Sequence, residues 1–157
     1  GAIAVALDKI SGAKVTAVEI DETAFSYLET NVKENNSSVK PVMADALEIC
    51  ETFADGELDL IVSNPPYIKS ADIETLQKEV RLEPRLALDG GEDGYDFYRE
   101  IVSRWSRKLK KGGALAFELG EGQADAVKAL MTDKGFSDFK ISLDFGGVQR
   151  AIIGTLL

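Results

Sequence analysis

The residues Asn64-Pro65-Pro66-Tyr67 form the stretch of this chain best suited to chemistry. They follow 58–62, a mostly apolar run that predicts a short buried strand. Two consecutive prolines hold φ near −65° and offer no backbone N–H, and a residue that precedes proline is held extended. The sequence therefore predicts a stiff loop at the carboxyl end of a strand, the place where open α/β sheets bind ligands.

A corner of this kind suits one chemical task, which is to hold an NH2 group attached to a planar system. The side-chain oxygen of Asn64 and the carbonyl of Pro65 could each accept a hydrogen bond from one N–H, while Tyr67 covers the flat face. The nitrogen lone pair would then point at an electrophile, and such positioning can supply much of a barrier reduction. The alternative is a proline-rich turn in which Asn64 only caps the local backbone.

Composition narrows the classes of function. The 157 residues are enough for one domain with a real core. The single cysteine, Cys50, excludes an internal disulfide and argues against a zinc site, and the absence of histidine excludes a His-containing catalytic triad. No apolar run approaches the ~20 residues of a membrane span, and no signal peptide is visible. We therefore expect a cytoplasmic protein that makes no membrane contact.

The charge balance bears on partners. With 18 basic and 27 acidic residues the net charge is −9. Broad adhesion to nucleic acid depends on Lys and Arg contacts to phosphate, so no direct nucleic-acid contact is expected.

Patterns typical of strands and helices alternate along the chain. Strands are expected at 13–20, 39–43, 59–63, 114–119, 136–143 and 148–156, and helices at 21–34, 97–109 and 123–134. The first ten residues fit either a helix or a buried strand. Gly112-Gly113 should close the helix 97–109, and Gly146-Gly147 should join the last two strands as a hairpin. The alternation implies a parallel sheet with helices on both faces, to which the hairpin adds an antiparallel strand.

Two further local signals can be read. Asp21 is suited to cap the helix that follows it. The polar segment 69–94 contains Pro84 and several glycines and is long for a simple connection. A segment of that length predicts a functional loop or lid.

The combination of motifs resembles the class I, S-adenosylmethionine-dependent methyltransferases. More narrowly, it resembles the HemK/PrmC family of glutamine N5-methyltransferases, which modify peptide chain release factors. The matching segments are Asn64-Pro65-Pro66-Tyr67, Arg81-Leu82-Glu83-Pro84 with Ala87-Leu88, Gly90-Gly91-Glu92-Asp93-Gly94 with Phe97-Tyr98, and Asp144-Phe145-Gly146-Gly147 with Arg150. The resemblance implies a Rossmann-like α/β fold, with a mostly parallel sheet and an antiparallel C-terminal hairpin strand. It covers essentially the whole chain.

The resemblance also implies roles for single residues. Asn64-Pro65-Pro66-Tyr67 would hold the substrate amide, with Asn64 also beside the cofactor. Glu19 would bind the ribose hydroxyls of S-adenosylmethionine, and Asp45 and Ala46 would line its adenine. The alternatives are an exposed strand-end acid at Glu19 and an ordinary turn at 45–46. Segment 90–94 is expected to serve loop architecture rather than chemistry.

One departure from the family concerns the start of the chain. The family's cofactor loop, a strand that ends in Asp-x-Gly-x-Gly-x-Gly, should precede Gly1, which corresponds to its last glycine. We therefore expect residues 1–157 to be a fragment of the catalytic domain. The central first strand, the glycine loop and an upstream helical domain that helps to recognise the release factor would be absent. A gap in the sheet and weak cofactor binding should follow.

Two other interpretations stay open. The Asn-Pro-Pro-Tyr motif is shared with enzymes that methylate amino groups of adenine or guanine in DNA or RNA, which act on a flipped or unpaired base. The acidic balance and the match over 81–98 disfavour this reading. A non-catalytic methyltransferase-like binding module is the second alternative, and the intact Asn64–Tyr67 loop disfavours it.

Overall fold

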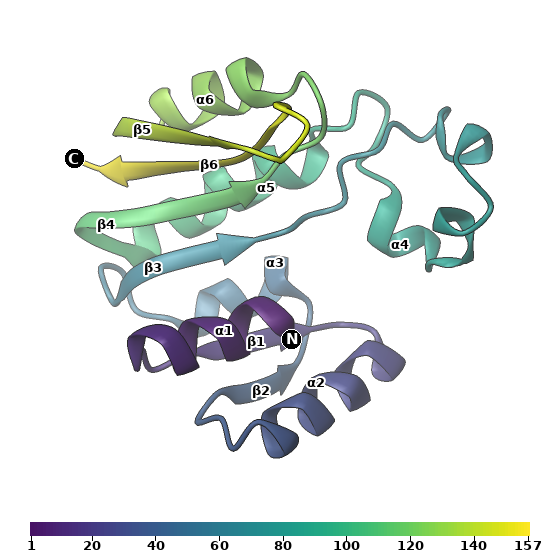
Figure 1. The fold of residues 1–157 in the computed structure, drawn as a ribbon. Helices are drawn as coiled ribbons and strands as arrows, with labels where there is room; N and C mark the ends of the chain where they lie inside the picture. The colour runs from purple at the N-terminus through teal and green to yellow at the C-terminus, as the bar shows by residue number, and fades with distance from the viewer. The chain divides into compact units, whose positions relative to one another are not determined.

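The computed structural model describes all 157 residues, which form two compact units, Gly1–Thr52 and Phe53–Leu157 (Figure 1). Each unit has its own small sheet. None of the helices is both long enough and apolar enough to cross a membrane.

The first unit is built around two parallel strands. Its elements are α1 (Ala2–Ser11), β1 (Thr16–Glu19), α2 (Glu22–Glu34), β2 (Lys40–Met43), α3 (Ala46–Ile49) and the 3-10 turn η1 (Cys50–Thr52). Strands β1 and β2 pair from Thr16 opposite Lys40 to Glu19 opposite Met43. A parallel pair needs a crossover, and α2 supplies it. The predicted cap of α2 is confirmed, because the Asp21 side chain accepts a hydrogen bond from the Ala24 N–H at 2.8 Å.

The first residues of the chain are helical, which settles the choice left open by the sequence. Helix α1 is capped at its C-terminal end by Gly12, which adopts φ 67° and donates its N–H to the Asp8 carbonyl at 2.8 Å. This left-handed conformation is the usual use of glycine at the end of a helix. Ile3 and Ile10 of α1 are exposed.

A second contact of α1 ties it to the loop before β2. The Asp8 carboxylate accepts hydrogen bonds from the Ser37 hydroxyl at 2.6 Å and from the Ser38 hydroxyl at 2.6 Å and N–H at 2.9 Å. The Ser37 hydrogen bond is the largest of the effects that lower the pKa of Asp8 from 3.8 to about 2. Hydrogen bonds to the ionised carboxylate favour that form.

The second unit holds a four-stranded sheet in the order β3-β4-β6-β5. Its strands are β3 (Leu58–Ser63), β4 (Leu109–Glu118), β5 (Phe136–Leu143) and β6 (Gln149–Leu156). Strands β3 and β4 are parallel, while β6 is antiparallel to both β4 and β5. The predicted mixture of parallel strands with an antiparallel C-terminal hairpin is confirmed. The two sheets are separate, and β3 and β1 each have a strand partner on one side only. The expected strand upstream of Gly1 stays a prediction.

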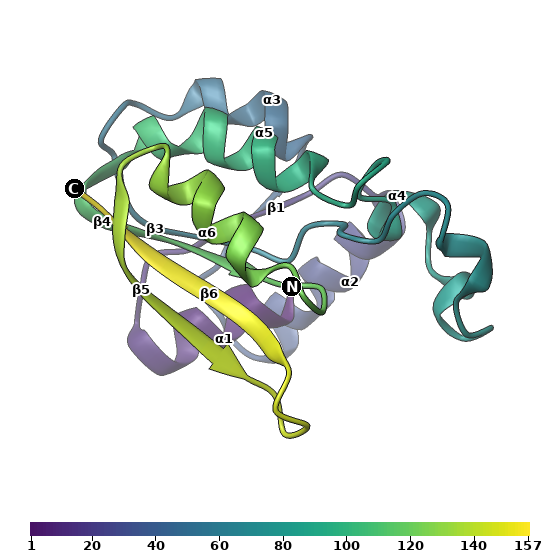
Figure 2. The ribbon, with the colours of Figure 1, turned by 90° about the horizontal axis from the view of Figure 1, so that it is seen from above.

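Helices α5 (Asp96–Trp105) and α6 (Ala124–Thr132) lie side by side on one face of this sheet (Figure 2). The Tyr98 ring of α5 meets the Phe117 ring of β4 edge-on, with centroids 5.2 Å apart. Both side chains are fully buried, together with Leu115, Leu119, Val127, Met131 and Ile152. An edge-to-face pair adds to the stabilisation that apolar burial gives.

One boundary in this unit differs from the prediction. Helix α5 ends at Trp105 and is followed by the 3-10 turn η4 (Ser106–Lys108), so Leu109 begins β4 and is not helical. The strand then runs through the glycines expected to close the helix. Leu58 is opposite Leu109 and Leu60 is opposite Ala114, so β4 carries a bulge in which Gly112 adopts φ 77°. Glycine is the residue that tolerates this conformation at a bulge.

Candidate active site

The Asn64–Tyr67 corner lies where the sequence placed it, directly after β3. Ser63 is opposite Phe117 of the parallel strand β4, so the loops that follow both strands leave the same edge of the sheet. Pro65 is buried, whereas Asn64 is exposed. Neither the Asn64 side chain nor the Pro65 carbonyl has a hydrogen-bond partner in the chain. Asn64 therefore does not cap local backbone, and two acceptors remain for a ligand.

The Tyr67 ring is held at both ends. Its hydroxyl lies 3.4 Å from Oε1 of Glu118, the last residue of β4. A Cβ at Gly120 would lie 2.9 Å from the ring atom Cδ2, so the ring packs directly on that backbone. Partial burial, together with the charge of Glu118, raises the pKa of the Tyr67 hydroxyl above its ordinary value. The hydroxyl is therefore protonated at neutral pH and acts as a donor.

The chain beyond the corner is fastened to residues 88–90. Ile68 donates its N–H to the Leu88 carbonyl at 3.0 Å, and Gly90 donates its N–H to the Ile68 carbonyl at 2.7 Å. The Ser70 hydroxyl donates to Oδ1 of Asp89 at 2.5 Å. These contacts join segments about twenty residues apart in the sequence. They close the loop between Ser70 and Leu88 directly beside the Asn64–Tyr67 corner.

Two glycines of the 90–94 turn pack on the backbone of the corner. A Cβ at Gly90 would lie 2.7 Å from the Tyr67 Cα, and a Cβ at Gly94 would lie 2.6 Å from the Tyr67 carbonyl oxygen. Gly94 also adopts φ 82°, which L side chains rarely take. The 90–94 turn thus has an architectural role, because it packs against the backbone of the corner.

Glu19 lies at the carboxyl end of β1 in the first unit. Its Oε1 accepts hydrogen bonds from the N–H groups of Ile20 at 2.9 Å and Asp21 at 3.0 Å, which fixes the carboxylate and leaves Oε2 available. The Glu19 carbonyl accepts the Ala44 N–H at 3.0 Å. That bond places the residues that follow β2 at the same sheet edge, so Glu19 and Asp45 are brought together there.

Asp45 is the N-cap of α3, a helix that the sequence analysis missed. Its Oδ1 accepts the Leu47 N–H at 2.7 Å, and Ala46 is the first residue of the helix. The turn expected as an alternative is therefore a helix start. An aspartate at this position is a preferred cap, and the carboxylate keeps a second oxygen for other contacts.

Gly1 is the N-cap residue of α1, and its carbonyl accepts the Val5 N–H at 3.0 Å. A Cβ at this position would lie 2.6 Å from Cδ1 of Leu28 in α2. The glycine allows α1 to begin in close contact with α2.

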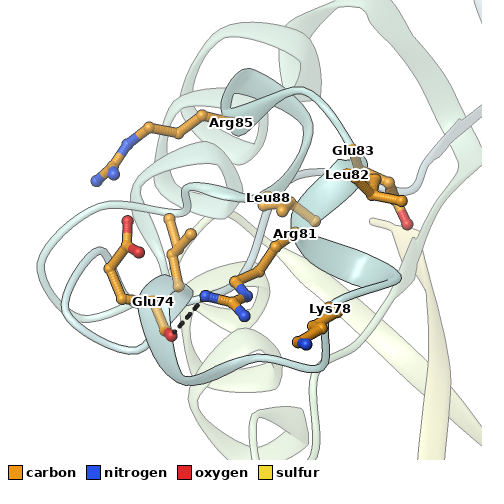
Figure 3. Close-up of a pocket in the computed structure, with 8 residues that line it drawn as sticks. Glu74, Lys78, Arg81, Leu82, Glu83, Arg85 and Leu88 are labelled. Carbon is orange, nitrogen blue, oxygen red and sulfur yellow. Dashed lines mark hydrogen bonds between the residues drawn. The ribbon is translucent and has the colours of Figure 1, made fainter.

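The segment expected as an irregular lid contains three short helical turns. They are η2 (Ile73–Thr75), η3 (Val80–Leu82) and α4 (Arg85–Leu88). These turns border an open cavity of about 550 Å³ (Figure 3). Arg81 donates to the Glu74 carbonyl across it at 3.5 Å, and the Leu82 side chain is almost fully exposed. The cavity combines basic, acidic and apolar groups.

Sequence reasoning missed Glu118 and Gln123. The strand ending near Glu118 was expected, and the rule that parallel strands end at one edge could have singled out its last residue. Gln123 carried no signal beyond being a polar residue at the start of a helix.

The fold and the corner together define an α/β methyltransferase domain. The model of the methyltransferase small domain family matches residues 1–83, which is more than half of the chain, and the chain belongs to that family.

Individual proteins that are similar to this chain carry more specific names. The release factor glutamine methyltransferase of Geobacter sulfurreducens is 43% identical to this chain over 99% of the chain and 55% of that protein. The protein of the same name from Thermodesulfovibrio yellowstonii is 34% identical over 98% of the chain and 55% of its own length. The chain thus spans about half the length of these relatives. A crystal structure of a methyltransferase from Pyrococcus furiosus is 26% identical, with a TM-score of 0.73 over 98% of this chain and 68% of that one.

Proposed function

We propose that the protein to which this chain belongs transfers a methyl group to the side-chain amide nitrogen of a glutamine in a peptide chain release factor. The observation that carries this proposal is the Asn64–Tyr67 corner, where two rigidly held acceptors have no partner within the chain. The primary amide of glutamine has two N–H donors and one flat π-system, which matches this set of groups. Relatives that carry the name release factor glutamine methyltransferase support the choice of substrate.

The corner compensates for the poor reactivity of its substrate. An amide nitrogen is a weak nucleophile because its lone pair is delocalised into the carbonyl. Hydrogen bonds from its two N–H groups to Asn64 and to the Pro65 carbonyl hold the nitrogen in place and favour the positive charge that develops on it. The Tyr67 ring covers the flat face. Methyl transfer leaves the nitrogen positively charged and therefore strongly acidic, so one of its protons can leave to water and give the neutral methylated amide.

The methyl donor that fits the first unit is S-adenosylmethionine. When bound, it supplies an electrophilic methyl group on a sulfonium centre. Oε2 of Glu19 is available to accept hydrogen bonds from ribose hydroxyls, and the second oxygen of Asp45 can accept a hydrogen bond from the adenine amino group beside Ala46. Gly1 begins α1 in close contact with Leu28 of α2, where a side chain would not fit. A carboxylate is an acceptor-only group, which suits both tasks.

The test is Asn64→Ala in the full-length protein, with a release factor as methyl acceptor and labelled S-adenosylmethionine as donor. Loss of one acceptor should lower kcat by about 10²-fold or more, which is typical for one such donor or acceptor at a transition state, while the cofactor Kd changes only modestly. Asn31→Ala, which removes an amide from α2, is the matched control. Near-normal turnover of Asn64→Ala would overturn the proposal. A release factor without the acceptor glutamine should take up no label.

A further inference from the structure

Gln123 uses its whole side-chain amide to join three segments around the corner. Nε2 donates to the Tyr67 carbonyl at 3.1 Å and to the Gly94 carbonyl at 3.2 Å. Oε1 accepts the Gly120 N–H at 2.9 Å and the Tyr98 hydroxyl at 3.2 Å. A primary amide offers two donor protons and two acceptor lone pairs, and all four are used. The residue is buried, with 7% of its surface exposed.

The four partners fix the orientation of the amide. Two carbonyl oxygens face the nitrogen, and an N–H and a hydroxyl face the oxygen. A rotation by 180° would set the side-chain oxygen against both carbonyls, so only one orientation satisfies every group. In a buried site each group left unsatisfied is costly.

Tyr98 of α5 helps to hold the side chain of Gln123 in place. It is fully buried, and its single hydroxyl proton is shared between Gln123 Oε1 and the Glu118 carbonyl, whose oxygen lies 2.9 Å from the hydroxyl. Burial raises the pKa of the Tyr98 hydroxyl well above its ordinary value, so the proton needed for these bonds is present at any working pH. The amide is therefore positioned before any ligand arrives.

We propose that Gln123 is a positioning residue for methyl transfer. By holding the Tyr67 carbonyl, it keeps the Asn64–Tyr67 loop in the conformation in which Asn64 and the Pro65 carbonyl present their free acceptors. Gln123 does not touch the substrate. This inference rests on the proposed function and adds to it. Displacement of reacting groups by about 1 Å can cost 10²-fold in rate, so the holding contact controls kcat.

The test is Gln123→Glu in the full-length protein. The ionised carboxylate can still accept from Gly120 and Tyr98 but cannot donate to Tyr67 or Gly94. We expect kcat to fall 10- to 100-fold with the cofactor Kd within about twofold of wild type. Burial beside two carbonyls raises the pKa of a carboxyl group, so kcat relative to wild type should recover as the pH is lowered, because the protonated form regains one donor. Gln123→Met keeps the volume without polar atoms and should show the loss without the recovery.

Hydrogen–deuterium exchange supplies a measurement that does not depend on turnover. Exchange over residues 64–70 should be faster in Gln123→Glu than in wild type. The control is Ser106→Ala, which removes a buried hydroxyl that donates to the Val102 carbonyl and does not touch the corner. It should lower the melting temperature with no change in kcat or in exchange over 64–70.

The outcomes separate the two proposals. An active wild type whose Gln123→Glu variant shows unchanged kcat and unchanged exchange would overturn the role of Gln123 and leave the proposed function standing. A wild type that methylates no release factor would overturn the proposed function, and exchange over 64–70 would still decide whether Gln123 holds the loop.

If neither Gln123 variant folds, the Tyr98→Phe variant is measured in the same assays. It removes one of the four bonds and should lower kcat by a smaller factor, with faster exchange over 64–70. Unchanged kcat and exchange in that variant would overturn the role.

Discussion

The two regions that carry candidate site residues are held in opposite ways. In the first unit, Glu19 bonds to the next two N–H groups, and Asp45 bonds to the N–H two residues on. In the second unit, Tyr67 is held by contacts with residues 90–123, which are distant in the sequence. Both regions lie at the carboxyl end of a parallel strand pair. Glu19 and Asp45 are thus positioned by bonds to neighbouring backbone, whereas the acceptors of the Asn64–Tyr67 corner are positioned by contacts with segments distant in the sequence.

The largest effect is expected at Gly94, which packs on the backbone of the Asn64–Tyr67 corner. Gly94→Ala in the full-length protein places a Cβ 2.6 Å from the Tyr67 carbonyl oxygen and forces a left-handed alanine. We expect kcat to fall by about 10²-fold, because the loop must move. Gly112→Ala is the matched control, since Gly112 has a similar φ of 77° but no atom within 4 Å of its Cβ. Both variants should lose about 1–2 kcal/mol in the free energy of unfolding from the left-handed conformation. Equal kcat in the two would show that the loop does not depend on Gly94.

A smaller effect is expected at Glu19, which is held by bonds to its own neighbours. In Glu19→Gln the side-chain oxygen can still accept from Ile20 and Asp21, so the free energy of unfolding should change by less than about 0.5 kcal/mol. The loss of charge should nevertheless weaken S-adenosylmethionine binding about tenfold or more, as is typical when a hydrogen bond to a charged group is lost. Calorimetric titration of the full-length protein measures the change, with Glu22→Gln as control. Unchanged affinity would show that Glu19 does not bind the cofactor and only accepts hydrogen bonds from the backbone that follows it.

The smallest expected effect concerns Asp8, whose side chain makes non-local contacts within the first unit. Its pKa is lowered to about 2, so the stability that it contributes is present above about 3.8 and is lost as the pH falls toward 2. Ser37→Ala should raise the pKa of Asp8 toward 3.8, because the Ser37 hydrogen bond contributes most to the shift. A carboxyl titration followed by NMR measures this, and Ser26→Ala on α2 is the control. A wild-type midpoint near 3.8 would contradict the contact.

What the sequence could predict follows the same division. The Asp21 cap, the strand before Asn64 and the C-terminal hairpin depend on residues close together in the chain, and each prediction is confirmed. The end of α5 could not be placed, because Leu109 continues the helical spacing of Ile101 and Trp105 and yet belongs to a strand.

The least predictable feature was the way the candidate site is held. The four bonds of Gln123 join residues up to 56 positions apart, and no local pattern encodes such contacts. The roles of Glu19, Asp45 and Ala46 toward a cofactor likewise stay predictions, because they depend on a ligand. The chemical groups of the candidate site could be predicted from the sequence, but the contacts that hold them in place could not.

The hydrogen bonds of Ile68 with Leu88 and Gly90 have a consequence for evolution. They bring the two ends of the intervening segment together. These bonds beside the corner therefore offset the entropic cost of closing the loop. Doubling the length of a flexible loop then adds only about 0.6 kcal/mol. Insertions or deletions in this loop would therefore cost little stability and leave Asn64 in place.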